Sequence, residues 1–144
     1  MKMSLPSILA SAAVFFSIVV AGGCGRGPSL VEVTGTVSYH GKPVPKANVV
    51  FQPEEGPPAM AVCDEQGMFK LATDGRPGAV AGPMKVAVSA VEVIKSIPPG
   101  DQYPEGLSIT RPRTPAKYAL VATSPLQVEV STSGENHFDL ELTD

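Results

Sequence analysis

The chain has 144 residues, of which 43% are hydrophobic and 17% charged, a composition typical of one folded domain rather than of a disordered segment. Its formal net charge is -3, and the sequence shows no cluster of basic residues that could bind a phosphate backbone. Nucleic acid is therefore excluded as a partner. Its 15 prolines and 14 glycines disfavour long helices and favour many turns, which indicates an all-β protein.

The N-terminal segment has the character of a secretory signal. Lys2 precedes an apolar run from Ile8 to Val20, and three small residues follow directly before Cys24. A positive start, an apolar middle and small residues at the end are typical of a cleaved signal peptide. The expected division of the chain is a signal peptide at 1–23, a short linker at 24–30 and one folded domain at 31–144.

The sequence Ala21-Gly22-Gly23-Cys24 resembles the lipobox of bacterial lipoproteins. In that class of protein the cysteine thiol is lipidated and the cysteine becomes the mature N-terminus. The resemblance implies a lipid anchor at Cys24 that holds the chain in the bacterial cell envelope, outside the cytoplasmic membrane, on either the inner or the outer membrane. A retained apolar anchor with an unmodified Cys24 is the alternative.

Strict alternation of apolar and polar residues from Val31 to Tyr39 predicts the first strand of the domain. Similar short runs recur along the chain, and turn residues separate them. Asp64 and Gly67 fit a four-residue turn, and Ser133–Asn136 is predicted to be a hairpin between the last two strands. The six further expected strands lie around 49–51 and at 60–63, 68–73, 84–91, 126–131 and 138–143. Seven short strands of this kind predict an antiparallel sandwich of two sheets.

The segment from Ile94 to Pro125 breaks this regular spacing. It carries six prolines and is longer than the connections usually found between strands. We expect residues 94–125 to be a long proline-rich loop before the last two strands. Loops on a rigid scaffold often carry recognition, so this loop is the predicted contact surface.

Several turn and core motifs resemble those of the carboxypeptidase regulatory-like, or transthyretin-like, β-sandwich domain. They lie at 33–37 (VTGTV), 41–51 (GKPVPKANVVF), 64–69 (DEQGMF), 82–88 and 136–140. The resemblance covers about residues 31–144 and extends to small bacterial envelope lipoproteins built on that domain. It implies an accessory domain that is folded as a two-sheet sandwich, and it implies no peptidase activity.

No pattern of catalytic or metal-binding residues stands out in the sequence. His40 and His137 have Pro43 and Leu140 three residues further on, so the paired ligands of a zinc peptidase are missing. No serine lies in a GxSxG or SxxK pattern. We therefore expect a protein that is not an enzyme and that has no cofactor and no metal.

Three carboxylates and one thiol have less obvious roles. Asp64, Glu65 and Asp74 lie at loop ends and leave open a weak calcium site, although their spacing lacks the alternation of a known calcium loop. Solvated turns are the expected role of these acids. Cys63 alternates with alanines in a strand-like run and is expected to be a buried, unreactive core residue.

Three functions follow as expectations. The first is a membrane-anchored, non-catalytic envelope lipoprotein that contacts a protein or a cell-wall component through residues 94–125. The second is a carbohydrate-binding module, for which Tyr103 and Tyr118 are the candidate stacking residues because the chain has no tryptophan. Packing of these two tyrosines against the sheets is the competing interpretation. The third is a purely structural envelope component. The expected partners are the membrane, through Cys24, and an envelope protein or polysaccharide.

Overall fold

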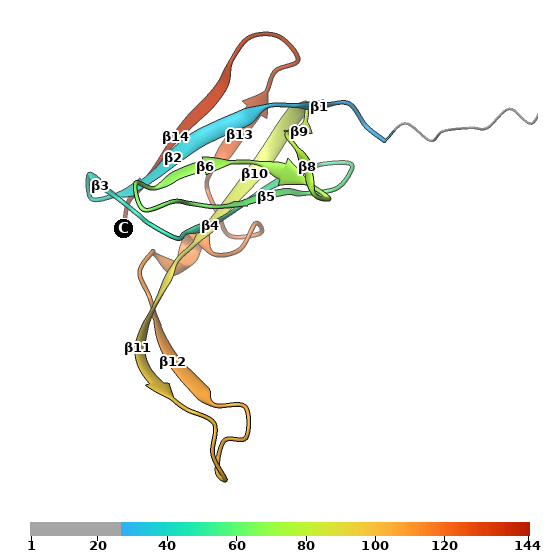
Figure 1. The fold of residues 1–144 in the computed structure, drawn as a ribbon. Helices are drawn as coiled ribbons and strands as arrows, with labels where there is room; N and C mark the ends of the chain where they lie inside the picture. The colour runs from blue at the N-terminus through green and yellow to red at the C-terminus, as the bar shows by residue number, and fades with distance from the viewer. Residues whose placement is uncertain (1–26) are drawn as a thin grey trace, which may run out of the picture.

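A computed structural model describes residues 27–144, which are almost wholly β-structure (Figure 1). The only helical element in this part of the chain is a short 3-10 helix, η1 (Ala116–Tyr118). The strands are β1 (Leu30–Val31), β2 (Val33–Tyr39), β3 (Lys42–Pro43), β4 (Asn48–Pro53), β5 (Ala59–Val62), β6 (Met68–Lys70), β7 (Ala72–Thr73), β8 (Arg76–Pro77), β9 (Ala79–Val80), β10 (Gly82–Ser89), β11 (Val91–Ile97), β12 (Leu107–Pro112), β13 (Gln127–Val130) and β14 (Asn136–Leu142). The expected all-β class is confirmed.

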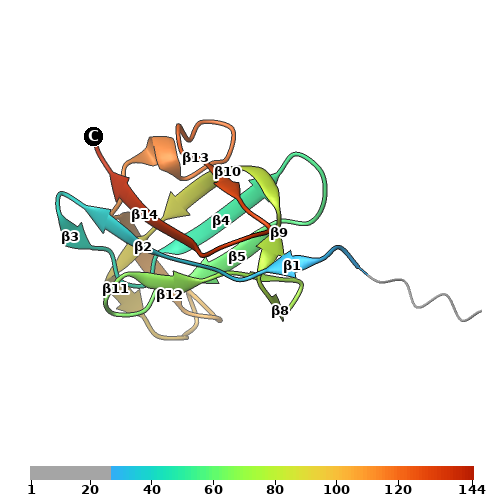
Figure 2. The same cartoon turned by 90° about the horizontal axis from the view of Figure 1, so that it is seen from above.

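Two larger sheets make up the body of the molecule. One has six strands in the order β13-β10-β4-β5-β7-β8, and the other has the order β14-β2-β3 with β6 also paired to β2. Viewed from above, β14 and β2 run across β4 and β10 (Figure 2). Fully buried side chains of both sheets, such as Val37 and Phe51, belong to one hydrophobic cluster, so the sheets face each other across it. Alternation of apolar and polar residues along each strand supplies that buried face.

The last two strands differ from the prediction, because they do not form a hairpin. β13 pairs with β10 in the six-stranded sheet, whereas β14 crosses to the other sheet and pairs in parallel with β2, from Asn136 opposite Val33 to Leu142 opposite Tyr39. The predicted all-antiparallel arrangement is therefore wrong at this pair. Asn136 holds the crossing segment, because its side chain accepts from the Ser131 amide at 2.8 Å and donates to the Ser131 carbonyl at 2.9 Å.

The turn at Asp64–Gly67 has the predicted chemistry and an unpredicted topology. The Asp64 carboxylate accepts from the amides of Gln66 and Met68, both at 2.9 Å, and Gly67 has a φ of 74°. The strands on its two sides belong to different sheets, since β5 pairs with β4 and β6 pairs with β2. This turn is thus a crossing point between the sheets.

The segment predicted as a proline-rich loop, residues 94–125, is irregular only in part, because it contains most of one strand and the whole of another. β11 and β12 pair with each other in antiparallel register from Val91 opposite Pro112 to Ile97 opposite Leu107. This hairpin, residues 91–112, projects from the body as an arm (Figure 1). The prediction failed for these strands because four of the six prolines lie at the tip or at the end of β12, where they interrupt no ladder hydrogen bond of a central strand, and the other two follow the hairpin.

The expected signal peptide and Cys24 lie outside the described residues. In residues 27–144, no helix has the length and apolar character needed to cross a bilayer.

Candidate functional site

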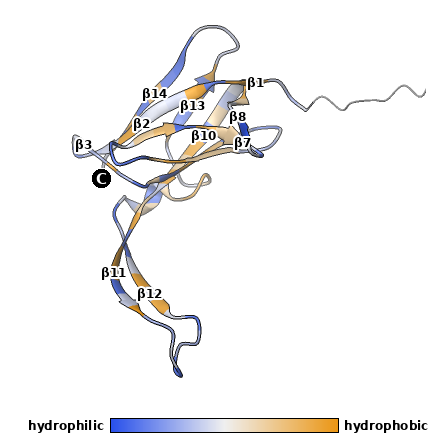
Figure 3. Ribbon diagram, in the orientation of Figure 1, coloured by the Kyte–Doolittle hydropathy of each residue, from blue (hydrophilic) through white to orange (hydrophobic). Residues whose placement is uncertain are grey.

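The arm carries the largest concentration of exposed aliphatic side chains in the described part of the chain. Val91, Val93 and Ile94 of β11 are 56%, 61% and 57% exposed. Ile94 is an extra residue at a β-bulge, where the register shifts between Val93 and Lys95. Figure 3 shows the apolar residues of the arm well away from the core of the body. Folding of the body leaves this apolar surface in water.

The second strand of the arm adds apolar residues towards the tip. Leu107 and Ile109 are exposed, and Leu107 lies opposite the half-buried Ile97. Nearer the body, Arg111 and Glu92 form an ion pair across the two strands, with the Arg111 Nε donating to Glu92 at 2.7 Å. The arm therefore presents apolar side chains around one charged rung.

Tyr103 lies at the tip of the arm and is half-buried rather than freely exposed. Its backbone carbonyl accepts from the amides of Gly100 and Gly106, both at 2.9 Å, and these bonds close the tip. Gly106 has a φ of 78°, and a Cβ atom there would lie 2.9 Å from the Ile97 carbonyl oxygen. The tip is thus a defined turn that requires glycine at position 106.

The arm is fastened to the body at its base. The Ala90 amide donates to the Thr114 hydroxyl at 3.2 Å, and the Arg113 amide donates to the Ala90 carbonyl at 2.8 Å. The Arg113 guanidinium also reaches the Pro45 carbonyl at 3.2 Å. The first two bonds join the residues at the two ends of the hairpin to each other, and the third ties one of these ends to the segment before β4.

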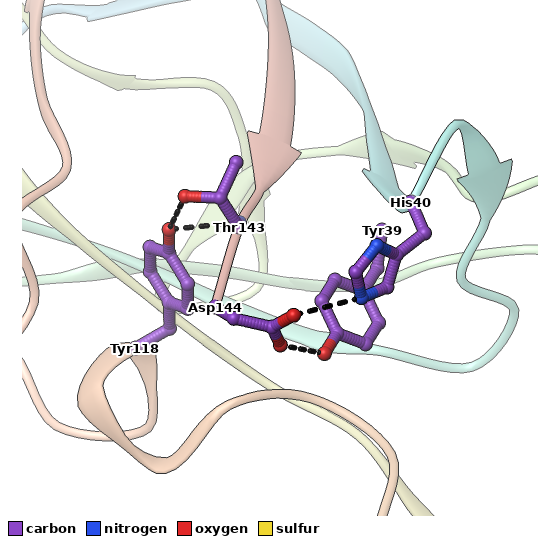
Figure 4. A network of polar contacts seen from close by, with 5 residues as sticks. All are labelled: Tyr39, His40, Tyr118, Thr143 and Asp144. Carbon is purple, nitrogen blue, oxygen red and sulfur yellow. Dashed lines mark hydrogen bonds and ion pairs between the residues drawn. The ribbon is translucent and has the colours of Figure 1, made fainter.

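The structure contradicts the role of Tyr118 as a stacking surface, because the residue is only 3% exposed and belongs to the core cluster. Its hydroxyl accepts from the Thr143 amide at 3.0 Å and contacts the Thr143 hydroxyl at 3.3 Å (Figure 4). These bonds lower the pKa of Tyr118, because they stabilise its phenolate form. Tyr118 anchors η1 to the end of β14, as the competing interpretation expected.

Beside Tyr118, the end of β14 contacts the end of β2. The Tyr39 hydroxyl donates to the Asp144 carboxylate, and the His40 Nε2 lies 3.2 Å from the other carboxylate oxygen (Figure 4). The hydrogen bond to Asp144 raises the pKa of Tyr39, since the phenol keeps its proton to donate. His40 and Asp144 are mostly exposed, so these three side chains link the ends of β2 and β14 at the surface and do not line a cavity.

The outer face of the β14–β2 pair carries a chain of polar contacts. The His137 Nδ1 lies 3.0 Å from the Thr34 hydroxyl, and its Nε2 lies 3.2 Å from the Asp139 carboxylate. Thr36 donates to the same carboxylate oxygen at 2.7 Å and lowers the pKa of Asp139. Each contact joins neighbours on adjacent strands or on one strand, so the chain is a cross-strand polar ladder on an open face.

The acidic residues considered for calcium do not come together. Within residues 27–144, no group of three or more histidine, cysteine or acidic side chains is placed to hold a metal ion. The Asp64 carboxylate is used by its own turn, and Glu65 forms an exposed ion pair with Lys46 at 3.5 Å.

A groove on the outer face of the six-stranded sheet is a feature that sequence reasoning missed. It has a volume of about 540 Å³ and is lined by residues of β4, β10 and β13 and by Glu54. The polar residues that line it alternate with buried residues in the sequence, which is a visible signal. Their meeting depends on the strand order, which the sequence does not show.

Comparisons with protein-family models, with curated proteins and with solved structures find no match for this chain.

Proposed function

We propose that the chain is a lipid-anchored, non-catalytic protein of the bacterial cell envelope that binds a protein partner through its arm. The observation that carries this proposal is the projection of the arm, with Val91, Val93 and Ile94 each more than half exposed. Exposed aliphatic side chains gathered on one element are typical of protein contact surfaces. The envelope location rests on the lipobox resemblance at Cys24.

The arm suits a protein partner better than a sugar. Its exposed side chains are mainly aliphatic, and aliphatic groups gain by contact with another apolar surface. Each of its two strands also has an outer edge that pairs with nothing else among residues 27–144, so a partner strand has backbone groups to bind there. The proposed sugar platform of two tyrosines loses its support, because Tyr118 is inside the core.

The transthyretin-like assignment forms part of the proposal. Two sheets that share one core, together with the turn chemistry at Asp64–Gly67, support that assignment. If the assignment is right, relatives of this chain should share the parallel pairing of β14 with β2. In this proposal the body carries the arm, which extends below it in Figure 1, whereas β1 lies at its upper right.

Site-specific photo-crosslinking in living cells tests the arm. A photoreactive residue at Val93 on the arm is compared with one at Val62, a β5 valine of nearly equal exposure on the body (61% and 63%). We expect one reproducible protein adduct from position 93 and none from position 62. Similar sets of many different adducts at both positions would contradict the proposal and favour the purely structural alternative.

Cys24→Ser tests the anchor separately. We expect the wild-type chain to incorporate a fatty-acid label and to sediment with membranes, and the variant to lose the label. Retention of an unlabelled wild-type chain in the membrane would instead support the uncleaved anchor. This result leaves the crosslinking experiment interpretable, since the arm does not depend on Cys24 for folding.

A further inference from the structure

The groove on β4, β10 and β13 lies on the sheet face that points away from the core. Lys85 is exposed between the buried Met84 and Val86, which identifies the outer face of β10. The volume of about 540 Å³ falls within the range of small-ligand sites. The arm plays no part in its lining, so the groove is an independent feature.

Polar side chains cross the groove in a row. Lys85 lies directly opposite Gln52 of β4 on one side and opposite Gln127 of β13 on the other. Neighbouring strands are about 4.8 Å apart, so the row offers hydrogen-bonding groups at a regular spacing. Glu129, opposite Pro83, lies diagonally from Lys85, and Glu54 follows the end of β4.

The charged groups of the groove are not used by the fold. In the described part of the chain, Lys85, Glu54 and Glu129 take part in no ion pair. Three other basic residues each pair with a glutamate, namely Lys46, Lys70 and Arg111. Of the two glutamines, Gln52 donates to the Pro53 carbonyl at 3.1 Å and keeps its own carbonyl free. The groove therefore holds neighbouring hydrogen-bond donors and acceptors that are available to a ligand.

This mixture of groups selects the chemistry of the ligand. A cation drawn to Glu54 or Glu129 would be repelled by Lys85, and an anion drawn to Lys85 would be repelled by the two carboxylates. A hydroxyl group can donate a hydrogen bond to a carboxylate and accept one from an ammonium or an amide. A ligand with many hydroxyl groups therefore suits both the acidic and the donor side chains of the groove. Pro83, which is exposed on the same face as Lys85, adds apolar surface for the C–H groups of such a ligand.

We propose that this groove binds an uncharged oligosaccharide through Gln52, Lys85, Gln127 and the two glutamates. Sugar binding is thereby placed on the sheet face rather than at the tyrosines. The proposal does not rest on the function of the arm.

A matched pair of glycans tests the proposal. The ¹⁵N-labelled full chain is titrated with the hexamer of N-acetylglucosamine, which is neutral, and with its deacetylated form, which is cationic. We expect saturable shifts of the backbone amides of the residues that line the groove and are not proline, namely Gln52, Glu54, Met84, Lys85 and 127–129, with the neutral hexamer and weaker binding of the cationic one. Lys85→Met should weaken binding by about tenfold, because it removes a charged hydrogen-bond donor.

Lys42→Met is the control, because it removes another exposed lysine, which lies on β3 and does not line the groove. It should leave the affinity unchanged. Preferential binding of the cationic hexamer would overturn the proposal in favour of an amine site. Absence of saturable shifts at the groove with the neutral hexamer, in a chain shown by circular dichroism to be folded, would overturn it outright.

Discussion

At the scale of single residues, Gly35 is confined by close packing rather than by its backbone angles. It lies in the middle of β2, with β14 on one side and β6 on the other. A Cβ atom at this position would overlap both the Phe138 carbonyl oxygen and the ring of Phe69. The Phe69 ring occupies the space that a side chain would need, and it packs near Phe51 in the core.

Gly35→Ala should therefore destabilise the protein by about 3 kcal/mol or more, because neither the backbone carbonyl nor the packed ring can move away cheaply. Urea unfolding followed by circular dichroism measures this loss. Gly100→Ala is the control, since a Cβ atom at Gly100 meets nothing within 4 Å. Similar stability of the two variants would show that Phe69 is free to repack.

The buried thiol of Cys63 supplies a second prediction at this scale. Burial, with the nearby charge of Asp64, raises the pKa of Cys63 from 9.0 to about 11, so the folded state holds the thiol proton more tightly than the unfolded state does. The resulting stability is complete below pH 9 and is lost as the pH rises towards 11. The slope due to this group is at most about 1.4 kcal/mol per pH unit.

The measurement compares the free energy of unfolding at pH 8 and pH 10.5 in Cys24→Ser and in Cys24→Ser with Cys63→Ala. We expect the second chain to lose less stability with rising pH. In the first chain, a thiol reagent at pH 8 should react only after urea is added. Rapid reaction without urea would show that Cys63 is accessible in the folded protein.

At the scale of elements, the arm and the body are energetically separate. None of the core-cluster residues lies between Ala90 and Tyr118, so β11 and β12 contribute nothing to the shared core. A two-stranded hairpin alone is marginally stable in water. Its order depends on its own ladder, on the Glu92–Arg111 pair and on its fastening at the base.

Replacing residues 93–110 by an Asn-Gly turn tests this separation. We expect the body to keep its free energy of unfolding to within about 1 kcal/mol, because the removed residues are surface residues. Glu92 and Arg111 remain to close the shortened hairpin. Hydrogen exchange in the intact chain should show faster exchange in β11 and β12 than in β10. Unfolding of the excised chain would mean that the arm stabilises the body.

At the scale of the whole molecule, β14 completes the second sheet as an edge strand that pairs in parallel with β2. The pair joins residues 103 positions apart, such as Thr36 and Asp139, and it buries Leu140 and Leu142. Contacts between such distant residues form late because closing a long loop costs entropy. The body is therefore complete only when the last strand has docked.

Removal of residues 136–144 should leave the chain unfolded at 25 °C. Each buried leucine contributes about 2–5 kcal/mol, which is a large part of the stability of a small domain. Insertion of Gly-Ser-Gly after Gly134 is the control, since a Cβ atom at that glycine meets nothing within 4 Å. We expect near-native circular dichroism for the insertion and loss of the cooperative transition for the truncation. A cooperative transition in the truncated chain would contradict the role given to β14.

The sequence by itself determined the all-β class, the apolar face of most strands and the chemistry of the Asp64–Gly67 turn. These features depend on residues close in sequence, through alternation and through local hydrogen bonds. It also placed Cys63 in the core, as the structure confirms. Cys24 and the signal peptide stay predictions, because the described residues begin at 27.

The tertiary structure alone decided which strands meet. The parallel docking of β14, the sheet crossing at Asp64–Gly67 and the row of Gln52, Lys85 and Gln127 all depend on strand order, and alternation is the same in any order. Proline content also misled at residues 94–125, because a projecting hairpin has no central strand for proline to disturb. The burial of Tyr118 also depends on residues distant in sequence, because its ring packs in the core cluster and its hydroxyl accepts a hydrogen bond from the Thr143 amide.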